Sequence, residues 1–168
     1  MTDSKGDPHV RLELLSQPRF LAAARAMVNN IAQRLGFADM LCGQISLAVD
    51  EALCNIINHG YDRKPDGHIW LSIWAIDEEP QGLRIVIEDR AKQVDPTSIR
   101  SRDLDEIRPG GLGVFIIREI MDDVRYEKRD CGGMRLTMLK RVPATDGQSN
   151  AKNTVTAGQA QVSRSSAP

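Results

Sequence analysis

The sequence has few cysteines and few aromatic residues, and neither sign of charge predominates. Cys42, Cys54 and Cys131 are scattered over 168 residues, an odd number without a Cys-x-x-Cys pair, which excludes a complete disulfide framework and a Cys-x-x-Cys metal site. Lys and Arg number 22 against 23 Asp and Glu, so the basic excess typical of nucleic-acid or membrane-surface binding is missing. No apolar run approaches the roughly 20 residues of a membrane span. These absences favour a cytoplasmic protein that binds neither nucleic acid directly nor membrane.

The length suits one domain followed by a tail. Residues 143–168 contain no Leu, Ile, Met, Phe, Tyr, Trp or Cys, so they cannot bury enough apolar surface to offset the entropy lost on ordering. We therefore expect one folded domain over residues 8–142 and a disordered tail over 143–168.

Hydrophobic periodicity predicts alternating groups of strands and helices. Strands are expected over 10–14, 68–76, 83–89, 124–128 and 134–141, and helices from near Pro18 to Leu35, over 39–58, and from Gly110 to 121. The order β, α, α, β, β, long polar loop, α, β, β predicts an α/β two-layer sandwich with helices mainly on one face of the sheet. On the strand over 68–76, Trp70 and Trp74 share the face opposite the apolar one, which suits either a partner surface or a layer buried under a loop.

The helix expected over 39–58 has two distinct faces when residues are placed 100° apart. One is a core face of four apolar residues, Ile45, Val49, Ala52 and Ile56. The other is a polar stripe of four residues, Glu51, Asn55, Asn58 and His59. The stripe offers a carboxylate for acid–base chemistry and an amide oxygen for a hard cation. The pattern alone fits a solvated face equally well.

A glycine-rich turn stands directly before the next helix. Gly110, Gly111 and Gly113 let the backbone approach an anion, and N–H groups at a helix N-terminus point toward it. A hinge or a helix cap has the same pattern, while a Walker A loop and a dinucleotide-binding fingerprint do not fit. The long polar segment Lys92–Pro109 before the glycines favours a lid that closes over phosphates.

Asp89 ends the strand expected over 83–89. A carboxylate there can accept a hydrogen bond from an exocyclic amine, and a turn-initiating aspartate is the alternative. Ala91, two residues on, leaves room for a ring to pack.

Three segments follow the order of the motifs of the GHKL ATPase superfamily. Glu51–Tyr61 resembles its N-box, Asp89–Pro96 its first glycine box, and Gly110–Arg118 its second. With its short length and its ending Gly132–Arg141, the chain is similar to the small anti-sigma factor serine kinases of bacterial partner-switching systems, over about Val10–Val142. The resemblance implies a histidine-kinase-like sandwich with a mixed, mainly antiparallel sheet.

The resemblance also implies roles for individual residues. Asn55 would ligate Mg²⁺ bridging the ATP phosphates, Glu51 would be the general base, and Asp89 would bind the adenine amine. The other residues that it places around ATP are Asn58, His59, Ala91, Gly110, Gly111, Leu112 and Gly113. One departure is Ala91, where the family usually has glycine, which makes the floor of the pocket slightly tighter.

The function implied is an ATP- and Mg²⁺-dependent protein-serine kinase that is also an anti-sigma factor. It would sequester a sigma factor, phosphorylate a serine of an anti-anti-sigma antagonist of the STAS type, and form a homodimer. Two alternatives stay open: a switch kinase acting on a STAS scaffold protein, and a catalytically silent module that binds ATP or ADP.

Overall fold

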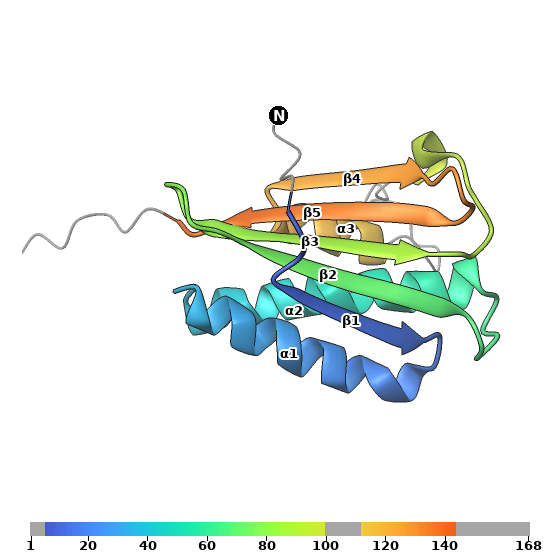
Figure 1. Cartoon of the computed structure of the whole chain (residues 1–168), viewed down its shortest axis with the longest axis horizontal. Helices are drawn as coiled ribbons and strands as arrows, with labels where there is room; N and C mark the ends of the chain where they lie inside the picture. Colours follow the sequence, from blue (N-terminus) through green and yellow to red (C-terminus); the bar gives the residue numbers. More distant parts are fainter. Residues whose placement is uncertain (1–5, 100–111, 144–168) are drawn as a thin grey trace, which may run out of the picture.

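A five-stranded sheet with helices on one face makes up the part of the chain that the structure describes (Figure 1). The structure is a computed structural model describing residues 6–99 and 112–143. Its main elements are β1 (Val10–Leu15), α1 (Leu21–Arg34), α2 (Asp39–Asn55), β2 (His68–Ile76), β3 (Gly82–Asp89), α3 (Leu112–Ile120), β4 (Asp123–Lys128) and β5 (Met134–Arg141). Short helical turns are η1 (Pro18–Phe20), η2 (Ile56–Gly60) and η3 (Pro96–Ser98).

The strands lie in the order β1-β2-β3-β5-β4, and each pairing between these neighbours is antiparallel. The register aligns one row of residues across all the strands: Leu12, Leu71, Ile87, Leu136 and Tyr126. The predicted two-layer α/β sandwich is confirmed, although the described sheet is antiparallel throughout rather than mixed.

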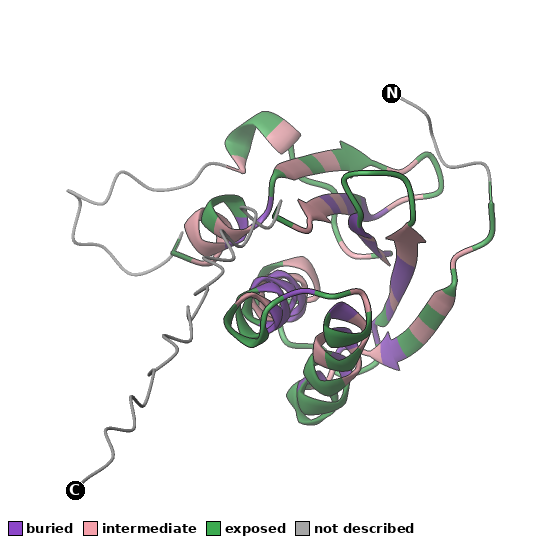
Figure 2. Cartoon of the chain, turned by 90° about the vertical axis from the view of Figure 1, so that its left-hand side faces the viewer, coloured by how far each residue is buried: buried purple, intermediate pink, exposed green. Residues whose placement is uncertain are grey.

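The core lies between the sheet and the helices. Ile69, Leu71 and Ile73 of β2 are at most 1% exposed, as expected for alternate residues on the inner face of a strand. They pack in one apolar cluster with Val28 of α1 and Val49 of α2. Figure 2 shows buried residues on the sides of helices and strands that face one another, and mainly exposed residues on the outer sides of the helices.

The central helix changes geometry near its end. α2 is regular as far as Asn55, and the five residues of η2 continue it as a π-helix. The Tyr61 N–H donates to the Ile56 carbonyl at 2.9 Å, closing this wider turn. The expectation of an ordinary helix to about Asn58 is therefore wrong in its last turn. Ile57 is buried, whereas Ile56, expected in the core face, is half-buried.

Asp39–Gly60 is long and apolar enough, by length and composition alone, to cross a membrane. In the fold it is the central helix of the helical layer, and its buried residues include Ile45, Ala48 and Val49. Core helices of soluble proteins satisfy the same criterion, so packing against the sheet accounts for this composition.

The outer face of the sheet carries Trp70 and Trp74, both half-buried. The Trp74 indole N–H donates to the Gly6 carbonyl at 3.0 Å, and the Arg84 guanidinium lies 4.1 Å from the centre of its ring. The Arg90 guanidinium lies 5.2 Å from the Trp70 ring centre. The chain's own N-terminal segment thus contacts Trp74, and both indoles remain half-buried, which leaves the two interpretations of this face open.

Candidate functional site

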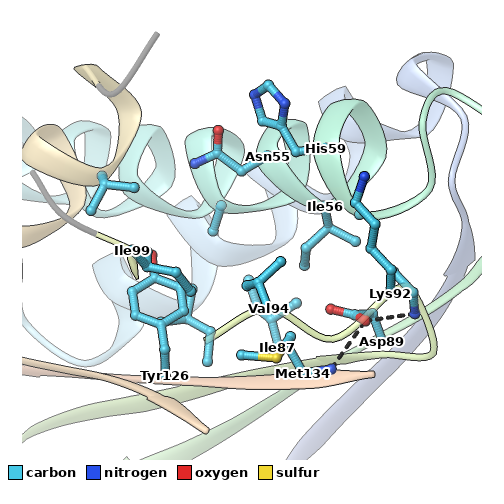
Figure 3. A pocket seen from close by; sticks show the side chains of 15 residues that line it. Asn55, Ile56, His59, Ile87, Asp89, Lys92, Val94, Ile99, Tyr126 and Met134 are labelled. Carbon is cyan, nitrogen blue, oxygen red and sulfur yellow. Dashed lines mark hydrogen bonds between the residues drawn. The ribbon is translucent and has the colours of Figure 1, made fainter. Parts of the chain in front are cut away.

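A cavity of about 230 Å³ opens between the end of the central helix and one end of the sheet. Its lining comes from α2 and η2, the adjoining parts of β3, β4 and β5, the segment after β3, and α3. The lining residues are Ala52, Asn55, Ile56, His59, Gly60, Ile87, Asp89, Ala91, Lys92, Val94, Ile99, Val114, Tyr126, Met134 and Leu136. Figure 3 shows the polar groups of Asn55, His59 and Lys92 along the helical side and Asp89 on the sheet side. Most of the remaining wall is apolar, which suits a flat ring held between polar anchors.

Asp89 is the buried acid of this cavity, with an exposed fraction of 3%. Its Oδ1 accepts hydrogen bonds from the backbone N–H groups of Ala91 (2.8 Å) and Met134 (3.2 Å). The other carboxylate oxygen points into the cavity (Figure 3). Burial raises the pKa of the Asp89 carboxyl, and these two hydrogen bonds and the Arg129 charge partly offset that effect. One oxygen is therefore fixed by the backbone, and the other can accept from a ligand.

The β4–β5 turn holds the backbone of Asp89 in place. Gly133 has φ +79°, and a Cβ on it would lie 2.0 Å from the Asp89 carbonyl oxygen, so only glycine fits. Arg129 donates to the same carbonyl at 2.5 Å and pairs with Glu88 at 3.3 Å. Gln93, from the segment after β3, donates to the Gly133 carbonyl at 3.1 Å. The turn and the segment after β3 thus form one rigid support.

The start of α3 lies against the polar stripe of α2. A Cβ on Gly113 would lie 2.6 Å from Glu51 Oε2 and 3.2 Å from Asn55 Nδ2. A side chain at this position would displace the Glu51 carboxylate from its present place, so glycine permits the close approach. The N-terminal end of α3 is thereby placed beside a carboxylate and an amide, at the mouth of the cavity that holds Asp89.

The structure brings some expected site residues together and leaves others apart. Asn55, His59, Asp89 and Ala91 line the cavity, and Glu51 and Gly113 meet beside it. Asn58 is exposed and its Oδ1 accepts from Arg63 Nε at 3.3 Å, outside the lining. Leu112 is 57% exposed. Gly110, Gly111 and most of the expected lid Lys92–Pro109 lie outside the described residues.

The described start of that segment is anchored at several points. Lys92 Nζ pairs with Asp62 at 3.1 Å. Val94 and Ile99 line the cavity, and the Ile99 carbonyl accepts from Arg118 at 3.2 Å. Residues 92–99 therefore already form one wall of the site.

Sequence reasoning gave no role in this cavity to two tyrosines. The Tyr61 hydroxyl donates to the His68 carbonyl at 2.6 Å and accepts from the Arg90 N–H at 2.9 Å, which fixes the backbone just after Asp89. Tyr126 lines the opposite end, and burial raises the pKa of its hydroxyl to about 12, so it stays neutral. Tyr61 stands within the N-box segment, so its position was a usable signal. Nothing local marks Tyr126.

A metal ion would find few protein ligands in the described part of the chain. No group of three His, Cys, Asp or Glu side chains there can hold one. Asn55 offers an amide oxygen beside the start of α3, and Mg²⁺ commonly takes one or two protein oxygens together with substrate phosphates. The residues present fit a metal carried in with a phosphorylated ligand.

Comparison with known proteins identifies the family. The histidine kinase-like ATPase domain matches residues 14–140. The chain belongs to this family, which defines it as a protein of the ATP-binding sandwich class.

The curated relatives define the group within the family. The serine-protein kinase RsbW of Listeria innocua is 28% identical over 150 residues, covering 86% of this chain and 94% of that protein. RsbW of Bacillus subtilis is 21% identical over 140 residues, covering 79% and 84%. The expected resemblance to the small anti-sigma factor kinases and the expected serine/threonine-protein kinase class are confirmed.

A solved structure of the RsbU and RsbW domains of Rv1364c from Mycobacterium tuberculosis shares the fold, with a TM-score of 0.54 and 16% identity. The match covers 79% of this chain and 31% of that longer one. At this identity the likeness bears on the fold alone.

Proposed function

We propose that the chain is an ATP- and Mg²⁺-dependent protein-serine kinase and anti-sigma factor. It sequesters a sigma factor and phosphorylates a serine on an anti-anti-sigma protein of the STAS type. The observation that carries the proposal is the approach of Gly113 to Glu51 and Asn55 at the mouth of the cavity that contains Asp89. In this proposal Asn55, as cation ligand, and Asp89, as acceptor for an amine, line one ligand-sized space, and Glu51 and the start of α3 lie beside it.

Each residue has a definite task in this proposal. Asp89 accepts from the adenine amine, and the apolar wall that includes Ala91 packs on the ring. His59 and the backbone N–H groups of Gly110 to Gly113 contribute to holding the phosphates, whereas Asn58, paired with Arg63 outside the cavity, has no part in it. Asn55 is the protein ligand of Mg²⁺. When bound, the metal neutralises phosphate charge.

The transfer step follows from this placement. Glu51 accepts the proton of the acceptor serine hydroxyl as that oxygen bonds to the γ-phosphorus of ATP. The bond between the γ-phosphorus and the bridging oxygen breaks, and ADP leaves with that oxygen. Protein contributions to phosphoryl transfer are mostly positioning and charge stabilisation. By its resemblance to the anti-sigma factor kinases, we also propose that the protein acts as a homodimer in the cytoplasm.

The direct test is transfer of ³²P from γ-labelled ATP to STAS-type proteins encoded in the same genome. We expect one of them to be labelled on serine in the presence of Mg²⁺. Glu51→Gln should slow labelling by about 10²–10⁴-fold, because a general base contributes that range, while ATP still binds in calorimetry.

A matched control is Glu119→Gln, which changes an exposed carboxylate on α3 and should label at the wild-type rate. Tight ATP binding with no labelling of any STAS protein would favour the silent nucleotide-binding module. Labelling without capture of a sigma factor would favour the switch kinase.

A further inference from the structure

The face of α2 that carries Glu51 and Asn55 continues toward the start of the helix, where it becomes apolar and exposed. At 100° per residue, Met40 and Leu47 fall within about 40° of Glu51. Met40 is 77% exposed and Leu47 is 43% exposed. Neither belongs to the buried core cluster, so two large apolar side chains face solvent on the side of the helix that carries the proposed base, Leu47 one turn and Met40 about three turns before it.

A glycine lies between them without an internal reason. Gly43 is exposed, its φ is not in the left-handed region, and no heavy atom lies within 4 Å of a Cβ built on it. Glycine is among the poorest helix formers, and neither backbone conformation nor packing within the described chain requires it here. The missing side chain therefore points to an external surface that approaches the helix closely. We call Met40, Gly43 and Leu47 the α2 patch.

The position of Glu51 indicates which molecule approaches α2 at this patch. Glu51 lies one helical turn after Leu47, between the patch and the start of α3 at Gly113. A general base must come within hydrogen-bond reach of the hydroxyl that it deprotonates. The polypeptide that presents a serine to Glu51 must then cross α2 next to Leu47, since the other side of Glu51 is the phosphate end of the site.

We propose that the α2 patch docks the segment of the phosphoacceptor protein that carries the acceptor serine. An apolar side chain next to that serine packs on Leu47 and Met40, and the segment's backbone approaches Gly43. The substrate class is thus a serine flanked by apolar residues rather than by a charged motif. This inference rests on the proposed kinase function.

The first test uses Gly43→Ala and Leu47→Asp with the STAS protein that the wild-type chain labels. We expect KM for that protein to rise at least tenfold in both variants, with kcat within about twofold and an unchanged Kd for ATP. Gly43→Ala should also raise Tm, because alanine is the better helix former and meets no obstacle. A variant that is more stable yet docks its substrate worse separates docking from folding.

Glu78→Ala, in the exposed β2–β3 turn, is the control and should leave KM unchanged. An unchanged KM in Gly43→Ala and Leu47→Asp, with active wild-type enzyme, overturns the docking proposal alone. Absence of any Glu51-dependent labelling overturns the proposed function, and the docking proposal with it.

The second test places the photocrosslinker p-benzoylphenylalanine at position 40 of the full chain in its host cells, with position 78 as the control site. We expect position 40 to crosslink to a protein that carries the phosphoserine, close to that serine in sequence, and position 78 not to do so. A crosslink from position 40 to a second copy of the chain, to residues 144–168, to a sigma factor, or to nothing overturns the proposal.

Discussion

Two features of the surroundings of Asp89 have opposite effects on its charged carboxylate: hydrogen bonds stabilise it and burial destabilises it. Two backbone N–H groups hold its Oδ1, while burial raises the pKa of the carboxyl. A carboxyl whose pKa is higher in the folded than in the unfolded state binds a proton more readily when folded. Its charged form therefore costs stability above that pKa, and the cost disappears as the pH falls through it. A charge retained at such a cost is consistent with a role in ligand recognition.

Asp89→Asn separates these two effects. The amide oxygen can still accept from Ala91 and Met134, so at pH 7 the ligand-free variant should be at least as stable as the wild type in urea unfolding. ATP affinity should fall and the preference for ATP over GTP should shrink in calorimetric titrations. On acidification the stability of the wild type relative to the variant should improve. Unchanged discrimination between ATP and GTP would place base recognition at another residue.

At the scale of elements, the end of the central helix and the loop after β3 fit each other closely. A Cβ on Gly60 would lie 2.9 Å from the Ala91 Cβ, closer than two methyl groups can pack. The departure from the family pattern at Ala91 is thus matched by the absence of a side chain at Gly60. The single methyl group fills the space between η2 and the segment that follows Asp89.

Variants that add a methyl group at position 60, with or without removal of the one at position 91, test this close packing. Gly60→Ala should lower the free energy of unfolding by about 1–3 kcal/mol, the usual cost of overpacking, and weaken ATP binding. The double variant Gly60→Ala/Ala91→Gly should recover most of the loss, because only one methyl is again present. Gly43→Ala, where a Cβ meets nothing, should instead stabilise by about 0.5–1 kcal/mol. If the effects of Gly60→Ala and Ala91→Gly on the free energy of unfolding in urea were simply additive, Gly60 and Ala91 would not be in contact.

At the scale of the whole molecule, the end of β5 is tied to neighbouring parts of the described chain. Arg141 N–H donates to Asp122 Oδ2 and Val142 N–H donates to the Gln81 carbonyl, each at 2.7 Å. Beyond them the composition of residues 144–168 offers little apolar surface for packing.

Truncation after Pro143 should therefore leave Tm within about 1 °C of the full chain in thermal unfolding followed by circular dichroism, since few interactions are lost. Truncation after Lys140 is the matched control and should lower Tm clearly, because it removes the bonds of Arg141 and Val142. A large fall in Tm for the first truncation would assign the tail a place in the fold.

Local sequence by itself determined most of the elements and their inner faces, except at the π-helical turn after Asn55. Alternation in 68–76 and helical spacing around Val49 specify buried sides without any long-range information, because side-chain direction repeats every two residues in a strand and every 3.6 in a helix. The order of Glu51, Asn55 and Asp89, read with their neighbours, was enough to indicate the family. Such features depend on residues close together in the chain.

Only the tertiary structure decided which polar residues meet. Asn58 shares a helical stripe with Asn55 in the sequence, yet the π-helical turn at its end leaves Asn58 paired with Arg63, outside the cavity. Tyr61 reaches Arg90, and Met134 reaches Asp89, across 29 and 45 residues. The order β1-β2-β3-β5-β4 and the approach of α3 to α2 bring these groups together. No local pattern specifies such distances, because they depend on how separate elements pack.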